Sequence, residues 1–298
     1  MTNSLDQIHL NFSPESLFLL NICLGFIMFG VALTLKVEHF RTLFQQPKAL
    51  ITGLVSQLLL LPLLTFLLIL LLKPQPSIAL GMIMVAACPG GNISNFIALL
   101  AKGNVALSVG MTAFVTILAT FLTPFNFAFW SSKVPETAEL LTVIHLSFGE
   151  MLQTVLMLLG VPLIIGMCFA HYFPQWTAKI SRPIRLLSIV FFAAFVVIAF
   201  ASNLEFFLGY IHLIAGIVLV HNGLALVSGY TLAKSVKLSH QDAKTISIET
   251  GIQNSGLGLV LIFNFFGGLG GMAIVAAWWG IWHMVAGLSL AWWWGRKD

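Results

Sequence analysis

Charged side chains are scarce in this chain, which has 8% Asp, Glu, Lys and Arg against 59% hydrophobic residues. Soluble domains carry about a quarter charged residues, so this composition excludes a soluble globular protein. Cysteine is scarce too. Cys23, Cys88 and Cys168 lie in hydrophobic runs without the paired spacing of a disulfide framework, and we interpret them as small buried hydrophobes. We expect an all-α polytopic membrane protein.

Long polar segments are also missing, and the longest polar connection is Ser131 to Glu139. Residues 1–16 form a short polar tail, because no basic residue precedes an apolar core there as in a signal peptide. The formal net charge of +4 comes from basic residues scattered through short loops rather than gathered into a patch. Nucleic acid is therefore not an expected partner, whereas the lipid bilayer is.

Hydrophobic stretches long enough to cross a bilayer, about 20 residues each, recur along the chain. We expect nine, at 17–35, 48–72, 78–100, 104–130, 140–172, 184–202, 208–233, 243–266 and 271–294. They divide into a first repeat of four helices within 17–130 and a second, inverted repeat of five within 140–294. Every Lys and Arg except Lys73 and Lys133 then falls on the cytoplasmic side of a cell membrane, with the N-terminus outside and the C-terminus inside.

Two of these spans are interrupted by glycines and polar residues. One contains Cys88-Pro89-Gly90-Gly91-Asn92-Ile93-Ser94-Asn95, and the other contains Glu249-Thr250-Gly251-Ile252-Gln253-Asn254-Ser255-Gly256. A carboxylate inside a span costs roughly 2.5 to 3.5 kcal/mol on insertion scales, so its presence indicates function. Broken helices in corresponding places of two antiparallel halves are typical of secondary transporters built from inverted repeats.

Oxygen-bearing side chains are concentrated at these interruptions. Glu249 with Thr250 and Gln253 supplies a carboxylate, an amide and freed carbonyls, which suit a hard cation such as sodium. Ser108 and Thr112, four residues apart, place two hydroxyls on one helix face. The alternative is that these two small residues only permit close helix packing.

We assign structural roles to the remaining ionisable residues within the expected spans. Glu150 lies near the entry of the fifth expected span, where an interfacial position accounts for it. His145, His221 and His283 are unclustered, so we interpret each as a hydrogen-bonded interior histidine rather than a metal ligand.

The second half of each broken helix begins with an N-terminal end that can bind part of the substrate. Unpaired N–H groups and the positive end of the helix dipole favour a negative group there, so we expect a carboxylate-bearing substrate. The residues that flank these ends are Gly90, Gly91, Asn92, Gly251, Asn254 and Gly256. Glycines could alternatively serve helix crossing alone, but that leaves the adjacent amides unexplained.

Several motifs occur in the order and spacing of a known family. They are Met28-Phe29-Gly30, Leu33-Thr34-Leu35-Lys36, Pro47-Lys48, the two interruptions, Gly103-Asn104-Val105-Ala106-Leu107-Ser108, His221-Asn222-Gly223 and Trp282-His283. At these residues the chain resembles the bile acid:sodium symporter family, and the likeness covers most of its length.

The resemblance implies a panel domain, a core domain in which the broken helices cross, and two sodium sites. The first would use Ser94, Asn95, Ser108, Thr112 and Glu249; the second would use Gln57, Glu249, Thr250, Ile252 and Gln253, with backbone oxygens from Thr250 and Ile252. Substrate is expected at the crossing, at Gly91, Asn92, Ile93, Asn254 and Ser255. No cofactor is expected beyond the two coupling sodium ions.

Three departures from the family pattern stand out. Some relatives have ten spans, whereas we expect this chain to start at the second of them and to have nine, as animal members do. Asn92-Ile93 replaces a pair that is often small or hydroxylic, and Met284 follows His283 where asparagine is common. The last two bear on substrate identity, which stays open between a bile-acid-like sterol conjugate and a small carboxylate such as pantoate.

We therefore expect a sodium-coupled symporter of an organic anion that works by alternating access. The main alternative is a proton-coupled or exchange-type carrier on the same fold, with Glu249 relaying protons. An intramembrane enzyme is disfavoured, because no pair of membrane aspartates and no His-Glu-x-x-His pattern occurs. A channel would need repeated pore-lining rings, which the asymmetric polar clusters do not supply.

Overall fold

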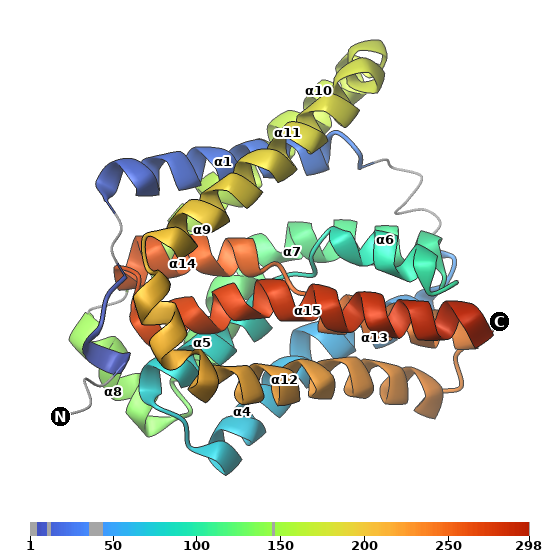
Figure 1. The fold of residues 1–298 in the computed structure, drawn as a ribbon. Helices are drawn as coiled ribbons and strands as arrows, with labels where there is room; N and C mark the ends of the chain where they lie inside the picture. The colour runs from blue at the N-terminus through green and yellow to red at the C-terminus, as the bar shows by residue number, and fades with distance from the viewer. Residues whose placement is uncertain (1–4, 11–12, 36–43, 145–146, 298) are drawn as a thin grey trace.

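The computed structural model describes residues 5–10, 13–35, 44–144 and 147–297, and the described part folds as helices (Figure 1). His145, which the sequence analysis interprets as an interior histidine, lies outside the described residues. The elements are a 3-10 turn η1 (Leu5–Gln7), α1 (Pro14–Ala32), α3 (Pro47–Val55), the π-helix η2 (Ser56–Leu60), α4 (Leu61–Leu72), α5 (Pro76–Ala87), α6 (Ile93–Leu100), α7 (Val105–Ser131), α8 (Pro135–Ile144), α9 (Phe148–Val155), the π-helix η3 (Leu156–Gly160), α10 (Val161–Tyr172), α11 (Pro174–Ala201), α12 (Leu204–Ser235), α13 (His240–Gly251), α14 (Ser255–Phe266) and α15 (Gly270–Lys297).

Six helical segments of the described chain are long and apolar enough to cross a membrane. They are Glu15–Ala32, Pro47–Leu72, Val105–Ser131, Phe148–Tyr172, Leu204–Ser235 and Gly270–Arg296. Proline opens many of the helices, at Pro14, Pro47 and Pro76 among others, because its fixed φ and missing N–H suit the first turn. These features agree with a polytopic membrane protein.

The fifth expected span, 140–172, is divided into two helices. The short helix α8 ends at Ile144, and a new helix begins at Phe148, where Ser147 accepts a hydrogen bond from the Glu150 N–H at 3.5 Å. Glu150 is exposed in the first turn of α9, where a carboxylate is favoured by the helix dipole. The first part of the expected span therefore belongs to a separate helix.

The N-terminal residues expected as a polar tail are partly folded onto the helices. The Asp6 carboxylate accepts a hydrogen bond from the Ser77 N–H at the start of α5 (2.7 Å). The Gly270 N–H donates to the Ile8 carbonyl at 2.7 Å, so the segment also reaches the start of α15. Leu5 in the same segment is fully buried, so hydrophobic packing also holds η1 against the helices.

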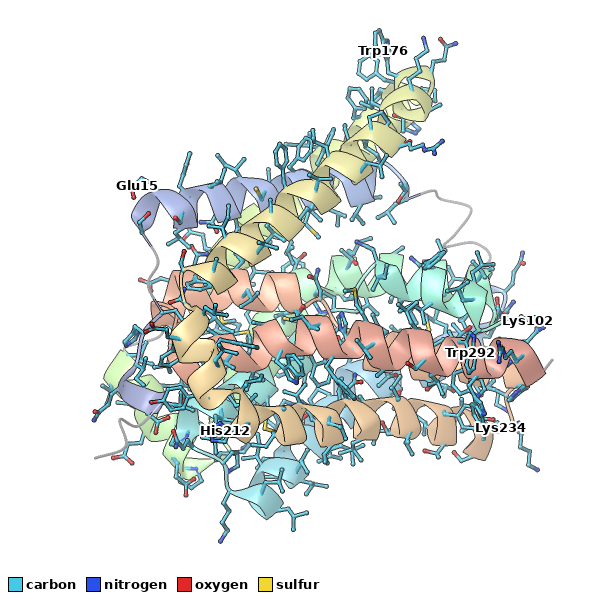
Figure 2. All side chains as sticks on the ribbon, viewed as in Figure 1. Glu15, Lys102, Trp176, His212, Lys234 and Trp292 are labelled. Atoms are coloured by element: carbon cyan, nitrogen blue, oxygen red, sulfur yellow. The ribbon has the colours of Figure 1, made fainter. Side chains whose placement is uncertain are left out.

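Figure 1 shows α1 lying with α10 and α11 above a larger group of helices that contains both interrupted segments. The first helix packs against α10, α11 and α14, and α5 packs against α15 and α7. Lys102, Lys234 and Trp292 lie at the end of the molecule that holds the C-terminus, far from Glu15 (Figure 2). The molecule therefore has one end rich in basic residues and tryptophan.

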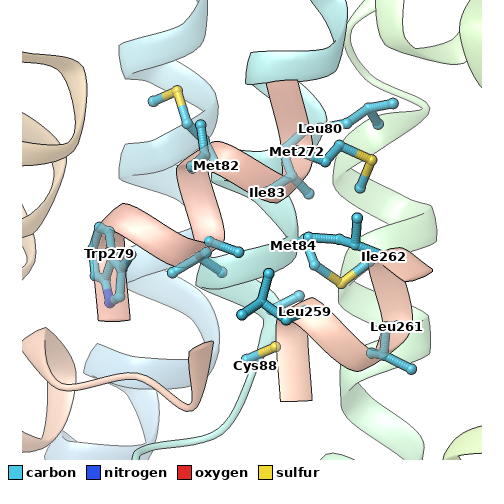
Figure 3. Packing of buried hydrophobic residues seen from close by; sticks show 14 of the residues in the cluster. Leu80, Met82, Ile83, Met84, Cys88, Leu259, Leu261, Ile262, Met272 and Trp279 are labelled. Atoms are coloured by element: carbon cyan, nitrogen blue, oxygen red, sulfur yellow. The ribbon is translucent and has the colours of Figure 1, made fainter. Parts of the chain in front are cut away.

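The main hydrophobic core joins the interrupted segments to α15. Leu80, Met84, Ile262, Met272 and Trp279 are almost completely buried and belong to one cluster (Figure 3). Because this core surrounds the ends of α5 and α14 nearest the breaks, it fixes the two breaks in place.

Candidate functional site at the helix crossing

The two interrupted segments cross at their breaks. One break separates α5, which ends at Ala87, from α6, which begins at Ile93; the other separates α13, which ends at Gly251, from α14, which begins at Ser255. The Gly91 N–H donates to the Ile252 carbonyl and the Asn254 N–H donates to the Pro89 carbonyl, each at 2.8 Å. Two extended stretches thus satisfy part of their backbone with each other, which matters in a membrane interior that offers no water.

The second break is shorter than the sequence suggested. Glu249, Thr250 and Gly251 remain helical, and the extended part covers Ile252 to Asn254. The Ile252 N–H still bonds to the Ile248 carbonyl at 2.9 Å, so the helix continues two residues beyond the acid, to Gly251. Glu249 is consequently presented from a rigid helical turn.

Glycine allows the crossing to be close. A methyl group on Gly90 would lie 2.8 Å from Gln57 Nε2 and 3.2 Å from Glu249 Oε2, and one on Gly91 would lie 3.2 Å from the Gln253 carbonyl oxygen. The same geometry shows that the Gln57 amide and the Glu249 carboxylate converge on Gly90.

All five residues assigned to the first ion set meet around the fully buried Glu249 carboxylate. Ser94 Oγ donates to Glu249 Oε1 at 2.6 Å, Ser108 Oγ donates to the same oxygen, and Thr112 Oγ1 lies 3.0 Å from Oε2. Asn95 Oδ1 accepts from Ser108 at 2.9 Å and from Thr112 at 3.2 Å. The hydroxyls of α7 therefore serve the acid on α13 and not helix packing alone.

The chemistry of this cluster suits a cation. Every hydrogen-bond contact of Glu249 in the described part of the chain comes from a neutral hydroxyl, so its charge, when ionised, is solvated but not balanced. The hydroxyls of Ser108 and Thr112 each face two acceptors but carry one proton. A buried carboxylate in a set of this kind is costly unless a positive ion joins it.

The residues assigned to the second ion set gather on the other side of the acid. Gln57 lies in the π-helix η2, fully buried, and neither its Oε1 nor its Nε2 has a hydrogen-bond partner among the described residues. Gln253 Nε2 donates to the Thr250 carbonyl at 2.7 Å, and Gln253 Oε1 has no partner in the part of the chain that the structure describes. Orphaned buried oxygens are costly unless a ligand or water completes them, so this set also fits an oxygen-seeking ion.

Backbone oxygens complete this second set. The Ile252 carbonyl accepts one hydrogen bond, from the Gly91 N–H, and the Thr250 carbonyl accepts one, from Gln253. A carbonyl oxygen has two lone pairs, so each retains capacity for a cation.

The residues expected to bind the substrate lie at the crossing and differ in how far they are exposed to solvent. Gly91 and Ser255 are buried, Asn254 is half-buried, and Asn92 and Ile93 are exposed, Ile93 by 40%. Asn92 is the N-cap of α6 without a side-chain bond, whereas Asn254 Oδ1 accepts from the Leu257 N–H at 3.0 Å. Asn92 and Ile93 are thus the accessible members of the group.

The end of α13 is held by side chains that sequence reasoning did not assign to the site. Asn222 Nδ2 donates to the Gly251 carbonyl at 2.7 Å, and Ser56 Oγ and Thr250 Oγ1 lie 2.7 Å apart. Ser247 Oγ donates to the Leu226 carbonyl at 2.6 Å. The position of Ser56 beside Gln57, and of Asn222 in a polar pair within a span, were the signals available.

Three further polar residues are accounted for by their surroundings. Lys244, expected at the cytoplasmic side, is fully buried and its Nζ donates to the Ala101 carbonyl at 3.1 Å, just past the end of α6. His221 Nε2 lies 2.6 Å from Thr65 Oγ1, and its ring lies 4.8 Å from that of Trp279. His283 is buried at 5% exposure on α15. The placement of His221 agrees with a hydrogen-bonded interior histidine, whereas the Nδ1 of buried His283 has no hydrogen-bond partner among the described residues.

Comparison with known proteins identifies the family of this chain. A model of the "Sodium Bile acid symporter family" matches residues 21–209. The chain belongs to this family. It is 36% identical over 293 residues to the "Uncharacterized sodium-dependent transporter YocS" of Bacillus subtilis, which covers 97% of this chain and 88% of that protein.

Eukaryotic relatives of the family are longer. The chain is 33% identical to the "Probable sodium/metabolite cotransporter BASS2, chloroplastic" of Oryza sativa subsp. japonica, over 83% of this chain and 57% of that protein. It is 31% identical to the "Sodium/bile acid cotransporter 5" of Rattus norvegicus, over 86% and 58%. The chain thus spans a little over half the length of these two. All three relatives are named as transporters or cotransporters, which are not enzymes.

Proposed function

We propose that this chain is a sodium-coupled symporter that imports an organic anion by alternating access. The observation that carries the proposal is the buried Glu249 carboxylate, which lies between a set of hydroxyls from α6 and α7 and the Gln57 amide of η2, which has no hydrogen-bond partner among the described residues. In this arrangement the acid, Ser94, Ser108, Thr112 and Asn95 hold one sodium ion. Gln57, Gln253 and the Thr250 and Ile252 carbonyls hold a second, with Glu249 shared.

The two ions and the acid act together in this proposal. An ion on each side of Glu249 balances the carboxylate and draws α6, α7, α13 and η2 toward one arrangement, so ion binding organises the crossing. The substrate's negative group then lies near Asn92, Ile93 and Asn254, where α6 and α14 begin. Because the linkage is reciprocal, substrate should raise the affinity for sodium by the same factor. The substrate class is an organic anion, either a sterol conjugate or a small carboxylate.

The membrane arrangement is part of the proposal. The six long segments, the two broken pairs α5–α6 and α13–α14, and α11 make nine spans that form two inverted repeats within 17–130 and 140–294. The end with Lys102, Lys234 and Trp292 faces the cytoplasm of a plasma membrane, with the N-terminus outside. The crossing then lies near the bilayer midplane, and a panel of helices that includes α1 moves against the core.

Thermal unfolding of the purified protein in detergent tests the ion sites. Sodium chloride is titrated against choline chloride at constant ionic strength, in wild type and Glu249→Gln. We expect a sodium-specific rise in Tm in wild type, corresponding to about 2.7 kcal/mol at 100 times the Kd, and no rise in Glu249→Gln. The amide has the shape of the acid but no charge to balance an ion.

Uptake into proteoliposomes then separates the two coupling modes. Sodium-driven accumulation of a labelled carboxylate, absent in Glu249→Gln, is the expected outcome. Accumulation that follows an imposed pH gradient without sodium, together with a flat sodium titration of Tm, would replace this proposal with a proton-coupled carrier.

A further inference from the structure

The π-helix η2 interrupts the regular helix of the segment Pro47–Leu72 at the residue that reaches the crossing. Its five residues, Ser56–Leu60, contain Gln57, and the Leu61 N–H bonds to the Ser56 carbonyl in the longer π pattern. A π turn holds one residue more than an α turn, so closing it would rotate the flanking residues by about 100° relative to each other. The direction of the Gln57 side chain therefore depends on this turn.

A proline beside this turn removes one backbone hydrogen-bond donor. Pro62, near the start of α4, has no N–H, so the Leu58 carbonyl four residues earlier lacks its usual α-helical donor. The carbonyl lies within a segment that a bilayer surrounds, where an unpaired backbone group is costly. A donor from another element is needed to keep the turn in this form.

Asn126 supplies that donor. This residue lies on α7, is 6% exposed, and its Nδ2 donates to the Leu58 carbonyl at 3.2 Å. It is separated from Leu58 by 68 positions in sequence, so the bond ties two different spans. The amide stands in for the N–H that Pro62 lacks.

We propose that Asn126 is a positioning residue for Gln57: by bonding to the Leu58 carbonyl it holds the π turn that directs the unpartnered Gln57 amide at Gly90 and Glu249. The proposal rests on the proposed function, since it assigns Gln57 to a sodium ion. It also gives α7 two tasks. The first half of α7 contributes Ser108 and Thr112 to one ion, and its second half sets the ligand of the other.

The test is the sodium concentration that gives half of the maximal rise in Tm, compared with Tm in choline chloride. We call this sodium concentration the half-point. Asn126→Leu keeps a similar volume and removes the donor. We expect the half-point of Asn126→Leu to be about 10-fold higher than that of wild type, because groups that orient a metal ligand typically contribute 10- to 100-fold to affinity. A purely structural role would lower Tm equally in sodium and choline and leave the half-point unchanged.

Two further variants sharpen the result. Thr123→Val is the matched control, since Thr123 is buried on α7 one turn earlier and its hydroxyl has no hydrogen-bond partner among the described residues; its half-point should equal that of wild type. Pro62→Ala restores an N–H that can close the π turn, so Tm in choline should hold or rise while the half-point increases. This variant also serves if Asn126→Leu does not fold.

A wild-type half-point in Asn126→Leu or in Pro62→Ala overturns the proposal. A wild-type protein whose Tm does not respond to sodium overturns the proposed function instead, before any variant is compared. The two failures are therefore distinguished within one set of titrations.

Discussion

The two half-helices that enter the crossing are buried to the same degree but differ in chemistry. In α5 every residue from Ser77 to Ala87 is buried, and nearly all of them are apolar. In α13 every residue from Ala243 to Gly251 is buried too, yet Lys244, Ser247 and Glu249 are among them. One half-helix is held mainly by packing, and the other combines packing through Ile246 and Ile248 with hydrogen bonds from neighbouring helices.

The difference shows where the chain concentrates its ion chemistry. An apolar half-helix is stable in any close-packed surroundings, as the core of Figure 3 illustrates for α5. A polar half-helix is stable only where neighbours supply partners, and α13 receives them from α6, α7, α12 and η2. The three predictions below are ordered by their expected effect on the sodium response, from the largest to none.

Gly90→Ala should have the largest effect of the three. The added methyl would lie 2.8 Å from Gln57 Nε2 and 3.2 Å from Glu249 Oε2, so it would occupy space that a sodium ion needs between them. The Gln57 amide can swing away, so the protein should fold, and we expect the sodium half-point in thermal unfolding to rise about 100-fold.

Gly258→Ala provides the control for Gly90→Ala. This glycine is buried on α14, and a methyl there would meet Cys88 Sγ at 3.6 Å, an ordinary contact. Its sodium half-point should stay at the wild-type value. Equal sodium half-points for the two variants would show that Gly90 does not border the ion-binding region.

Thr112→Val should have an intermediate effect. The change keeps the shape of the side chain and removes the hydroxyl that lies 3.0 Å from Glu249 Oε2 and 3.2 Å from Asn95 Oδ1. We expect the sodium half-point to rise about 10-fold. Thr116→Val is its control, because the Thr116 hydroxyl donates to the Thr112 carbonyl of its own helix at 2.6 Å. A shift of the same size in Thr116→Val would mean that helix packing, not ligation, causes the change.

The sequence predicted the meeting of these groups better than it predicted the elements that carry them. A carboxylate, hydroxyls and amides inside apolar spans have few physical explanations, which marked these segments as functional, and the family resemblance then assigned Glu249, Ser94 and Thr112 to one ion set. The spacing of Ser108 and Thr112 fixed their common face. Their assignment to sodium stays a prediction until the titrations are made.

Other features depend on contacts that no local pattern reveals. The π turn at Gln57 requires both Pro62 and a donor 68 positions from Leu58, and only the fold brings that donor there. The sequence prediction joined the end of α8 to α9, because apolar residues lie on both sides of the junction, in 140–144 and from Met151 onward. The burial of Lys244 likewise depends on the carbonyl at the end of α6.

Met84→Ala should lower the free energy of unfolding and leave the sodium half-point unchanged. Met84 is fully buried in α5 and lies beside Ile262 and Leu259 in the core (Figure 3). Truncating a side chain of this size in a close-packed interior costs about 2 to 5 kcal/mol, chiefly through the cavity it leaves. Tm should therefore fall by the same amount in sodium and in choline chloride, with a wild-type half-point. A raised half-point would show instead that the packing of α5 is transmitted to the ligands, and the division between a structural and an ion-binding half-helix would have to be abandoned.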